Sequence, residues 1–216
     1  MVNILVLCDD LWHPAEVVKM GIQALQVEEF HFDFVMAAKD ILTPERIALY
    51  QVIICCKGNQ IRGANPEPWF EEGVTEVCPK EFEEYVRRGG GFISLHSGNT
   101  SKKGDAYTEF IGNYFMGHPP RCGVDVVITA DHPVTKGVKD FHVRDEHYQI
   151  AVTAQDAVEL FRTRSAAGGE QIAGYVRELG EGRKCVITLG HCIDVWYHEE
   201  FKKLLTNAIR WCTHIS

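Results

Sequence analysis

The sequence has little positive charge and no long cluster of it. Its 22 lysine and arginine residues are outnumbered by 30 acidic residues, which leaves a formal net charge of −8. Basic pairs such as Arg87–Arg88 and Lys202–Lys203 fit solvent-exposed helix faces. Nucleic-acid binding needs a basic patch that neutralises phosphates. We therefore expect no nucleic-acid partner.

Long apolar runs and disulfide-type cysteine spacing are missing as well. No segment approaches the roughly 20 apolar residues that a membrane span requires. The apolar N-terminus has no basic flank and runs into Asp9 and Asp10, so it predicts a strand and not a signal peptide. The eight cysteines include no C-x-x-C pair, and several lie in apolar runs. We expect a reduced, cytoplasmic protein without a membrane partner.

The composition is that of an ordinary globular protein. Apolar residues make up 45% and charged residues 24% of the 216 positions, which excludes a disordered chain. We find no internal repeat, no low-complexity tract and no shift in composition. The sequence therefore predicts a single domain over residues 1–216.

The first half alternates buried strands with helices. Proline residues at 14, 44 and 79 mark helix starts, where a missing N–H is tolerated, and Thr43 precedes the second as a cap. This order predicts right-handed crossovers and a doubly wound, mostly parallel sheet with helices on both faces. The expected strands are 3–8, 30–36, 51–56 and 92–96.

The second half changes to short strands joined by tight turns, such as Gly180–Gly182. This pattern predicts an antiparallel extension of the sheet. A helix is expected near 105–115, and an amphipathic helix over 199–213 ends the chain. The expected strands are 124–129, 141–150, 158–163, 171–179 and 183–189.

Histidines recur near the ends of the expected strands. His13 follows the first strand, His96 ends the fourth, and His191 follows the strand 183–189. His147 lies in the run Asp145–Tyr148. Ligands of open α/β sheets bind beyond the carboxyl ends of the strands. The sequence therefore predicts a histidine-rich site at that edge.

His96 stands in the most distinctive local context. The run 89–98 puts a polar side chain at the tip of a buried strand, followed by small residues, as in a nucleophile elbow. The run departs from that pattern because position 94 is Ser and the central residue is His, which is not the usual nucleophile. Histidine can still act as an acid, a base or a metal ligand.

The polar run Asp145–Tyr148 supplies the acids of the predicted site. Strand alternation would place Glu146 and Tyr148 on one side, and Asp145 and His147 on the other. A carboxylate beside an imidazole can orient its tautomer, transfer protons or bind a metal. We predict His96, His191, Glu146 and Asp145 as catalytic residues.

Aromatic residues and a long loop complete the predicted site. Trp12, Trp69 and Trp196, with His13 and Tyr148, could contact a sugar ring. Residues 57–78 combine Gly and Pro with weak periodicity and read as a loop or lid. Gly190 would let the chain turn sharply before His191.

A divalent metal such as zinc is the one cofactor that these residue types suggest. Imidazole and carboxylate are suitable zinc ligands, and we predict His13, His96 and His191 for this role. No H-x-x-x-H or H-E-x-x-H spacing occurs, so the ligands would have to assemble across the fold. The sequence contains no nucleotide-cofactor motif.

Motifs along the whole chain resemble the ThuA-like (trehalose utilisation) family. They are the runs 9–14, 89–98, 110–119, 131–138, 145–148 and 182–191, followed by Trp196 and 207–211. The resemblance implies a flavodoxin-like sheet related to class I glutamine amidotransferases, with His96 where those enzymes have cysteine and His191 near their histidine. Their Cys-His-Glu mechanism therefore does not carry over to this chain.

Three functional hypotheses follow, and the partner that we expect is a small-molecule sugar. The first is an enzyme acting on a disaccharide or keto-sugar through the histidine–carboxylate site, with or without a metal. The second is a non-catalytic sugar-binding or regulatory module. The third is a hydrolase using a cysteine outside the elbow. The sequence leaves open whether the chain forms a homo-oligomer.

Overall fold

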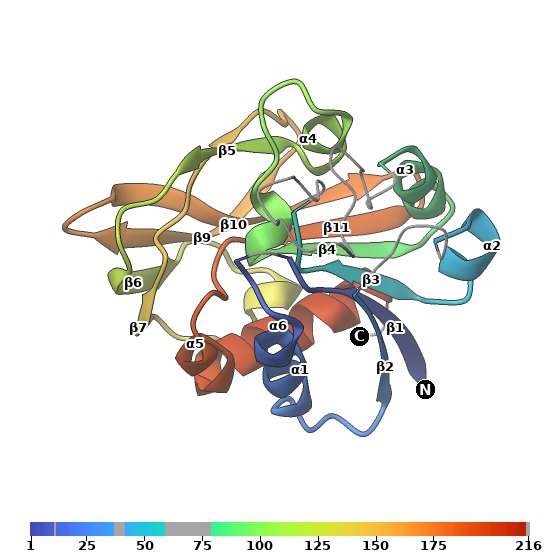
Figure 1. Ribbon diagram of the computed structural model, residues 1–216, viewed down its shortest axis with the longest axis horizontal. Coiled ribbons are helices and arrows are strands. Elements are labelled where there is room, and N and C mark those ends of the chain that lie inside the picture. Colours follow the sequence, from blue (N-terminus) through green and yellow to red (C-terminus); the bar gives the residue numbers. More distant parts are fainter. Residues whose placement is uncertain (11, 37–41, 59–78, 215–216) are drawn as a thin grey trace, which may run out of the picture.

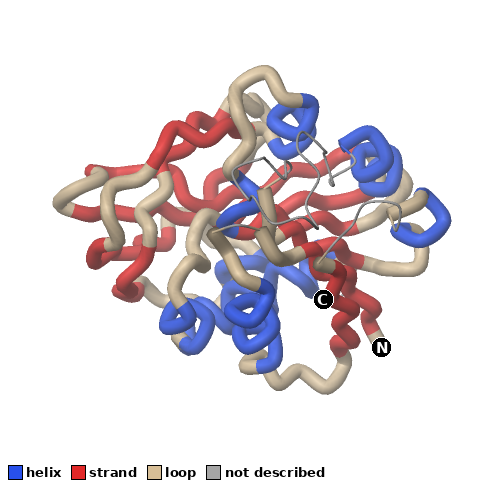
Figure 2. The backbone as a smooth tube through the Cα atoms, in the orientation of Figure 1, coloured by secondary structure: helices blue, strands red, loops and turns tan. Residues whose placement is uncertain are grey.

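A nine-stranded sheet runs through the molecule, with helices packed on both of its faces (Figure 1, Figure 2). The computed structural model describes residues 1–10, 12–36, 42–58 and 79–214. The strands are β1 (Val2–Leu7), β2 (Phe30–Val35), β3 (Val52–Cys55), β4 (Gly91–Leu95), β5 (Asn113–Gly117), β6 (Cys122–Ile128), β7 (Phe141–Asp145), β8 (Gln149–Val152), β9 (Val158–Ser165), β10 (Gly169–Leu179) and β11 (Gly182–Ile187). The helices are α1 (Ala15–Gln23), α2 (Pro44–Ile47), α3 (Pro79–Arg87), α4 (Ala106–Ile111), α5 (Ile193–Tyr197) and α6 (Glu199–Cys212), with short 3-10 turns η1 (His96–Asn99) and η2 (Pro133–Thr135).

One half of the sheet is parallel and has the order β2-β1-β3-β4-β11. Its first four strands alternate with α1, α2 and α3, which confirms the predicted order of elements. Strands β1, β3, β4 and β11 are almost wholly buried, because helices cover both of their faces. A strand that is covered on both faces needs apolar side chains on both, which explains their near-continuous apolar sequences.

The other half continues the same sheet with antiparallel neighbours, in the order β11-β10-β9-β6-β7. The turn between β10 and β11 begins at Gly180, whose φ of 62° lies in the left-handed region. The expected antiparallel extension is thus present. The sheet is mixed and not mostly parallel, however, since parallel and antiparallel neighbours are equally common in it.

Two segments of the second half differ from the prediction. The expected strand 141–150 is divided into β7 and β8, and residues 146–148 lie between them. The expected helix near 105–115 stops at Ile111, where Gly112 (φ 91°) ends α4, and β5 follows directly. Strands β5 and β8 pair with each other as a separate two-stranded sheet. Periodicity alone does not show where a strand leaves one sheet for another.

Two apolar cores lie on opposite faces of the sheet. Helices α1, α5 and α6 cover one core, and α2, α3 and α4 cover the other (Figure 1). Strand alternation separates the cores: Ile4 and Val6 belong to the first, and Leu5 and Leu7 to the second. Within the described residues, no helix has the length and apolarity needed to cross a bilayer.

Candidate functional site

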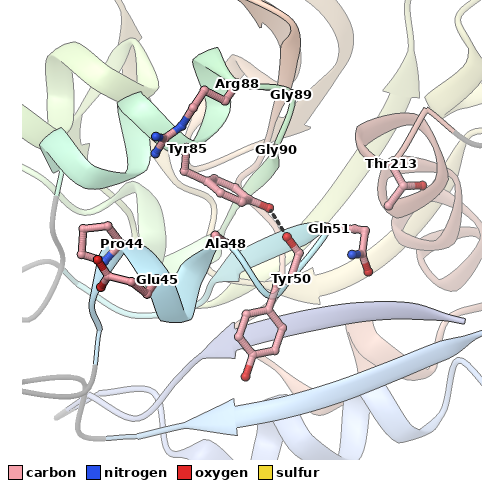
Figure 3. Close-up of a pocket in the computed structure, with 10 residues that line it drawn as sticks. All are labelled: Pro44, Glu45, Ala48, Tyr50, Gln51, Tyr85, Arg88, Gly89, Gly90 and Thr213. Atoms are coloured by element: carbon pink, nitrogen blue, oxygen red, sulfur yellow. Dashed lines mark hydrogen bonds between the residues drawn. The ribbon is translucent and has the colours of Figure 1, made fainter.

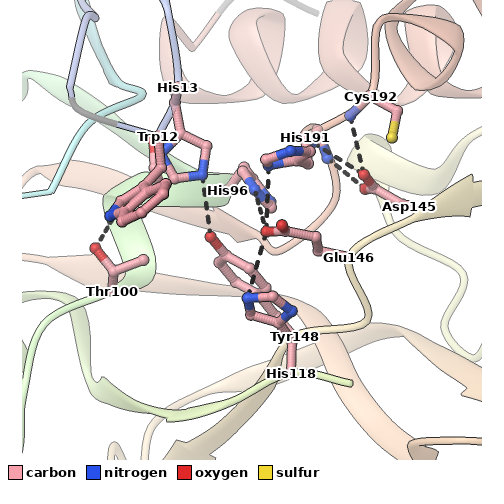
Figure 4. Close-up of polar contacts among 12 residues, drawn as sticks. Trp12, His13, His96, Thr100, His118, Asp145, Glu146, Tyr148, His191 and Cys192 are labelled. Atoms are coloured by element: carbon pink, nitrogen blue, oxygen red, sulfur yellow. Dashed lines mark hydrogen bonds and ion pairs between the residues drawn. The ribbon is translucent and has the colours of Figure 1, made fainter. Parts of the chain in front are cut away.

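Three histidines converge beyond the carboxyl ends of three parallel strands (Figure 4). His13 follows β1, His96 begins η1 directly after β4, and His191 follows β11. Their ring centroids lie 4.9 to 5.4 Å apart. The parallel half of the sheet thus brings together imidazoles that are 178 positions apart in the chain.

Glu146 supplies the carboxylate of this cluster from the antiparallel half. It comes immediately after β7, and its Oε2 lies 3.2 Å from Nδ1 of His191 and 3.6 Å from Nε2 of His96. One potential ligand atom from each of His13, His96, Glu146 and His191 lies within 4.8 Å of the others. We call these four residues the His–Glu cluster.

Hydrogen bonds fix which nitrogens of two rings carry protons. Nδ1 of His96 lies 2.8 Å from the carbonyl oxygen of Thr188, which can only accept, so Nδ1 donates. Nδ1 of His13 donates to the Asp10 carboxylate at 2.7 Å. In the neutral rings, Nε2 of His13 and Nε2 of His96 therefore carry lone pairs.

The His–Glu cluster brings the acceptor Nε2 of neutral His96 against the acceptor carboxylate of Glu146. Nε2 of His96 and Nδ1 of His191 are buried and have no hydrogen-bond partner among the described residues. Burial lowers the pKa of His96 and so favours its neutral form. Burial alone would raise the pKa of Glu146, but the neighbouring His191 and His96 lower it well below its usual range. A carboxylate therefore faces imidazole nitrogens and requires a cation or a proton between them.

The backbone at His96 has the strained form of an elbow. His96 has a φ of 44°, a left-handed conformation that is uncommon for a residue with a Cβ. A Cβ on Gly98 would lie 2.3 Å from the carbonyl oxygen of Cys55, so only glycine fits there. Gly190 (φ 133°) passes beside His96 in the same way. The elbow-like geometry predicted for 89–98 is present, with histidine at its tip.

Asp145 and Glu146 are adjacent but differ in their surroundings. The Asp145 carboxylate is fully buried and accepts the backbone N–H groups of Gly190, His191 and Cys192 at 2.8 to 3.1 Å. Asp145, predicted as catalytic, therefore holds the loop that carries His191. His147 points away from the His–Glu cluster and bonds two hydroxyl groups on β9. Glu146 and Tyr148 lie on the opposite side, as alternation predicted.

Tyr148 and His118 complete the surroundings of the carboxylate. The Tyr148 ring is stacked on His96 at 4.1 Å, and its hydroxyl lies 3.4 Å from Nε2 of His13. His118, after β5, places Nε2 3.6 Å from Oε2 of Glu146 and leaves a third of its side chain exposed. Sequence reasoning gave His118 no role and read it only as a residue of extended backbone before Pro119.

The three tryptophans predicted to contact a sugar have different positions. Trp196 is 1% exposed, packs against Gly21 of α1, and donates its ring N–H to the Gly190 carbonyl. Its predicted contact with a ligand is therefore wrong, because no face of the ring is open. Trp12, beside His13, is 73% exposed (Figure 4). Trp69 and most of the expected lid, 59–78, lie outside the described residues.

No cysteine belongs to the His–Glu cluster in the part of the chain that the structure describes. Cys192 follows His191 directly, but burial raises the pKa of its thiol, so the reactive thiolate is disfavoured. The hypothesis of a cysteine-dependent hydrolase has no support from this arrangement.

A larger cavity than the small pocket at the His–Glu cluster lies elsewhere among the described residues. It has a volume of about 610 Å³ and lies at the opposite edge of the sheet, between α2 and the end of α3 (Figure 3). Its lining includes Tyr50 and Tyr85, which hydrogen-bond to each other, and the exposed Arg88. Among the described residues, no group of potential metal ligands lies there. Size alone does not identify the functional site.

The structure thus defines an α/β protein with a histidine–carboxylate cluster at the carboxyl edge of a mixed sheet. The chain belongs to the ThuA family, described as trehalose utilisation, which matches residues 4–212. No curated protein matches the sequence.

Solved structures of low sequence identity share this fold. A ThuA-like protein from Bacteroides uniformis is 18% identical with a TM-score of 0.75, and the match covers 98% of this chain and 91% of that one. A ThuA-like protein from Parabacteroides merdae is 17% identical with a TM-score of 0.74, over 98% and 90%. A cytoplasmic protein from Salmonella typhimurium is 13% identical with a TM-score of 0.68, over 98% and 99%.

Proposed function

We propose that this protein is an enzyme of carbohydrate metabolism that acts on a disaccharide or keto-sugar through a divalent metal held by the His–Glu cluster. The ThuA family membership supports the carbohydrate role. The observation that carries the site is the convergence of imidazole nitrogens on the Glu146 carboxylate, with Nε2 of His96 and Nδ1 of His191 buried and without a hydrogen-bond partner among the described residues. We place the protein in the cytoplasm.

The donor set fits a borderline metal such as zinc. His13, His96 and His191 offer imidazole nitrogens and Glu146 offers one carboxylate oxygen, which is the ligand type that zinc accepts. A cation at this place would replace the unfavourable approach of two acceptors, Nε2 of His96 and the Glu146 carboxylate, with attractive contacts. Each neutral tautomer would already be set before the ion arrives, because Asp10 and Thr188 occupy the opposite nitrogens of His13 and His96.

The surrounding residues suit a carbonyl or hydroxyl substrate. A bound divalent ion supplies Lewis-acid polarisation of a carbonyl oxygen. His118 lies beside Glu146 and is partly exposed, so it can exchange a hydrogen bond with a sugar hydroxyl. Tyr148 packs on His96 and restricts its ring, while the exposed Trp12 offers an apolar face to a sugar ring. No step of this proposal uses a cysteine nucleophile.

We also infer kinship with flavodoxin-like, amidotransferase-related folds. The strand order β2-β1-β3-β4-β11 corresponds to the order 2-1-3-4-5 of the flavodoxin-like class. His96 lies at the tip of the elbow, where a nucleophile would stand in an amidotransferase. Fold kinship carries no activity by itself, so the proposed function rests on the His–Glu cluster.

Elemental analysis of protein purified without added metal tests the proposed metal. We expect about one zinc-like ion per chain in the wild type and its loss in His96→Ala. The matched control is His142→Ala, since His142 is exposed and, within the described part of the chain, pairs with Asp125 alone. Added metal at 100 times its Kd should raise the free energy of unfolding by about 2.7 kcal/mol. Failure of the wild type to bind any divalent ion would refute the metal.

Incubation with disaccharides and their keto derivatives, followed by NMR of the mixture, tests the proposed activity. We expect a new product with the metal-loaded wild type and none with His96→Ala or His191→Ala. The rival hypothesis, a sugar-binding or regulatory module, predicts saturable binding without any product. Full turnover in both variants would exclude the site as the catalytic centre.

A further inference from the structure

Asp10 connects His13 of the His–Glu cluster to the segment that follows β3. Its Oδ1 accepts Nδ1–H of His13 at 2.7 Å and the backbone N–H groups of His13 and Trp12 at 2.9 and 3.0 Å. Its Oδ2 accepts the backbone N–H of Gly58, after β3, at 3.0 Å. The carboxylate thus fixes the position of His13 and the loop that carries it.

The three histidines of the cluster have different partners on their outer nitrogens. His96 donates to a backbone carbonyl, whereas His13 donates to a carboxylate. His191 directs Nδ1 toward Glu146, and its other nitrogen has no hydrogen-bond partner among the described residues. A carboxylate partner makes an imidazole a stronger ligand than a carbonyl does, because its negative charge stabilises the positive charge that develops on the ring.

We propose that Asp10 is a positioning residue that orients His13 and strengthens it as a metal ligand. This inference rests on the proposed metal site and adds a residue to it. Asp10 is not a member of the His–Glu cluster and acts on it through His13, whose ring and backbone it holds. Outer partners of this type typically contribute 10- to 100-fold, as an order of magnitude, to metal affinity.

Asp10→Asn is the test, with Co²⁺ as the probe ion. The amide keeps the oxygen that accepts from His13 but loses the negative charge. We expect the Co²⁺ affinity to fall by about 10- to 100-fold and the visible absorption spectrum of bound Co²⁺ to change. The matched control is Asp9→Asn, because the neighbouring Asp9 loses the same charge and only accepts the N–H of Ala15. Its Co²⁺ affinity should stay within about twofold of the wild type.

A double-mutant cycle separates positioning from general damage to the site. If Asp10 acts through His13, Asp10→Asn should have almost no further effect on Co²⁺ affinity in a His13→Ala background. An equal loss in both backgrounds would show that the substitution disrupts the whole site, which would overturn the inference. Thermal unfolding of the metal-free variants shows whether each one is folded.

The inference and the proposed function fail in different ways. Wild-type affinity and an unchanged Co²⁺ spectrum in Asp10→Asn would overturn the role of Asp10 and leave the metal site intact. A wild-type protein that binds no Co²⁺ would refute the proposed metal site, and the role of Asp10 with it.

Discussion

Two buried polar clusters meet at the turn η1 but differ in whether their hydrogen-bond donors and acceptors are paired. His96, at its start, belongs to the His–Glu cluster, where acceptors face acceptors. Asn99, at its end, bonds Ser94 and the carbonyl of Ile187, so donors there meet acceptors. A matched network stabilises the fold by itself, whereas an unmatched convergence requires a ligand.

The matched network extends away from the site. Asn113 donates to the hydroxyl of Tyr175, which in turn donates to the carbonyl of Ile111. Only Oδ1 of Asn113 lacks a well-aligned partner among the described atoms of this network. These residues are neutral and join η1, α4 and β10, so we assign them a structural role. The following substitutions test this division.

Glu146→Gln should have the largest effect on metal binding. The amide offers N–H donors to the imidazole lone pairs, so it converts the unmatched cluster into a matched one. We expect metal affinity to fall by more than about 100-fold, beyond the loss typical of outer partners. The metal-free protein should become more stable by about 1 kcal/mol.

Isothermal titration with Zn²⁺ and urea unfolding measure these two effects of Glu146→Gln. Glu109→Gln, on the exposed face of α4, is the control for the loss of a carboxylate. A metal-free Glu146→Gln protein less stable than the wild type would contradict the acceptor-against-acceptor description.

Gly98→Ala should affect both clusters, because Gly98 lies between His96 and Asn99. The added Cβ would approach the Cys55 carbonyl to 2.3 Å and force the turn to move. We expect a loss of about 2 to 3 kcal/mol in stability and weaker Zn²⁺ binding. Urea unfolding measures the stability, and titration of the same preparation with Zn²⁺ measures the affinity. If stability fell and affinity did not, the elbow would not be what positions His96.

Tyr175→Phe should affect stability alone. It removes one buried hydroxyl that donates to Ile111 and accepts from Asn113. We expect a loss of about 1.5 kcal/mol in the free energy of unfolding and an unchanged Zn²⁺ affinity. Tyr197→Phe, at an exposed position, is the matched control. A change in affinity would show that the two clusters are coupled.

The free energy of unfolding should depend on pH through Lys184, a buried residue outside the His–Glu cluster. Burial lowers its pKa from 10.5 to about 7, and its ammonium group contacts the Phe110 carbonyl and ring. Between about pH 7 and 10.5 the unfolded chain binds more protons at this residue than the folded protein. The contribution of Lys184 to the free energy of unfolding therefore rises with pH in that window, by up to about 1.4 kcal/mol per pH unit.

Urea unfolding of the wild type and Lys184→Met across this pH window measures the effect. The difference in stability between the two should shrink steadily as pH rises, because the wild type loses the penalty of a buried charge. Parallel pH profiles for the two proteins would show that Lys184 does not titrate there.

Much of the site was predictable because the residue that follows a parallel strand in the sequence always lies at the carboxyl edge of the sheet. The strands before His13, His96 and His191 are continuous apolar runs, and parallel pairing brings their ends together. Alternation likewise gave the correct side for Glu146 and Tyr148. His118 was missed because β5 leaves the main sheet to pair with β8. Trp196 was misjudged because its burial depends on the small residue Gly21 on another helix.

The sequence by itself determined the alternation of strands and helices, the elbow residue and the types of side chain at the carboxyl edge. These follow from local periodicity and from residues that precede or end a strand. Only the tertiary structure decided that Asp145 holds a loop while Glu146 faces the imidazoles, and that Asp10 accepts the backbone N–H of Gly58. Hydrogen-bond partners and the burial of a charge depend on segments far apart in the chain, whose positions no local pattern encodes.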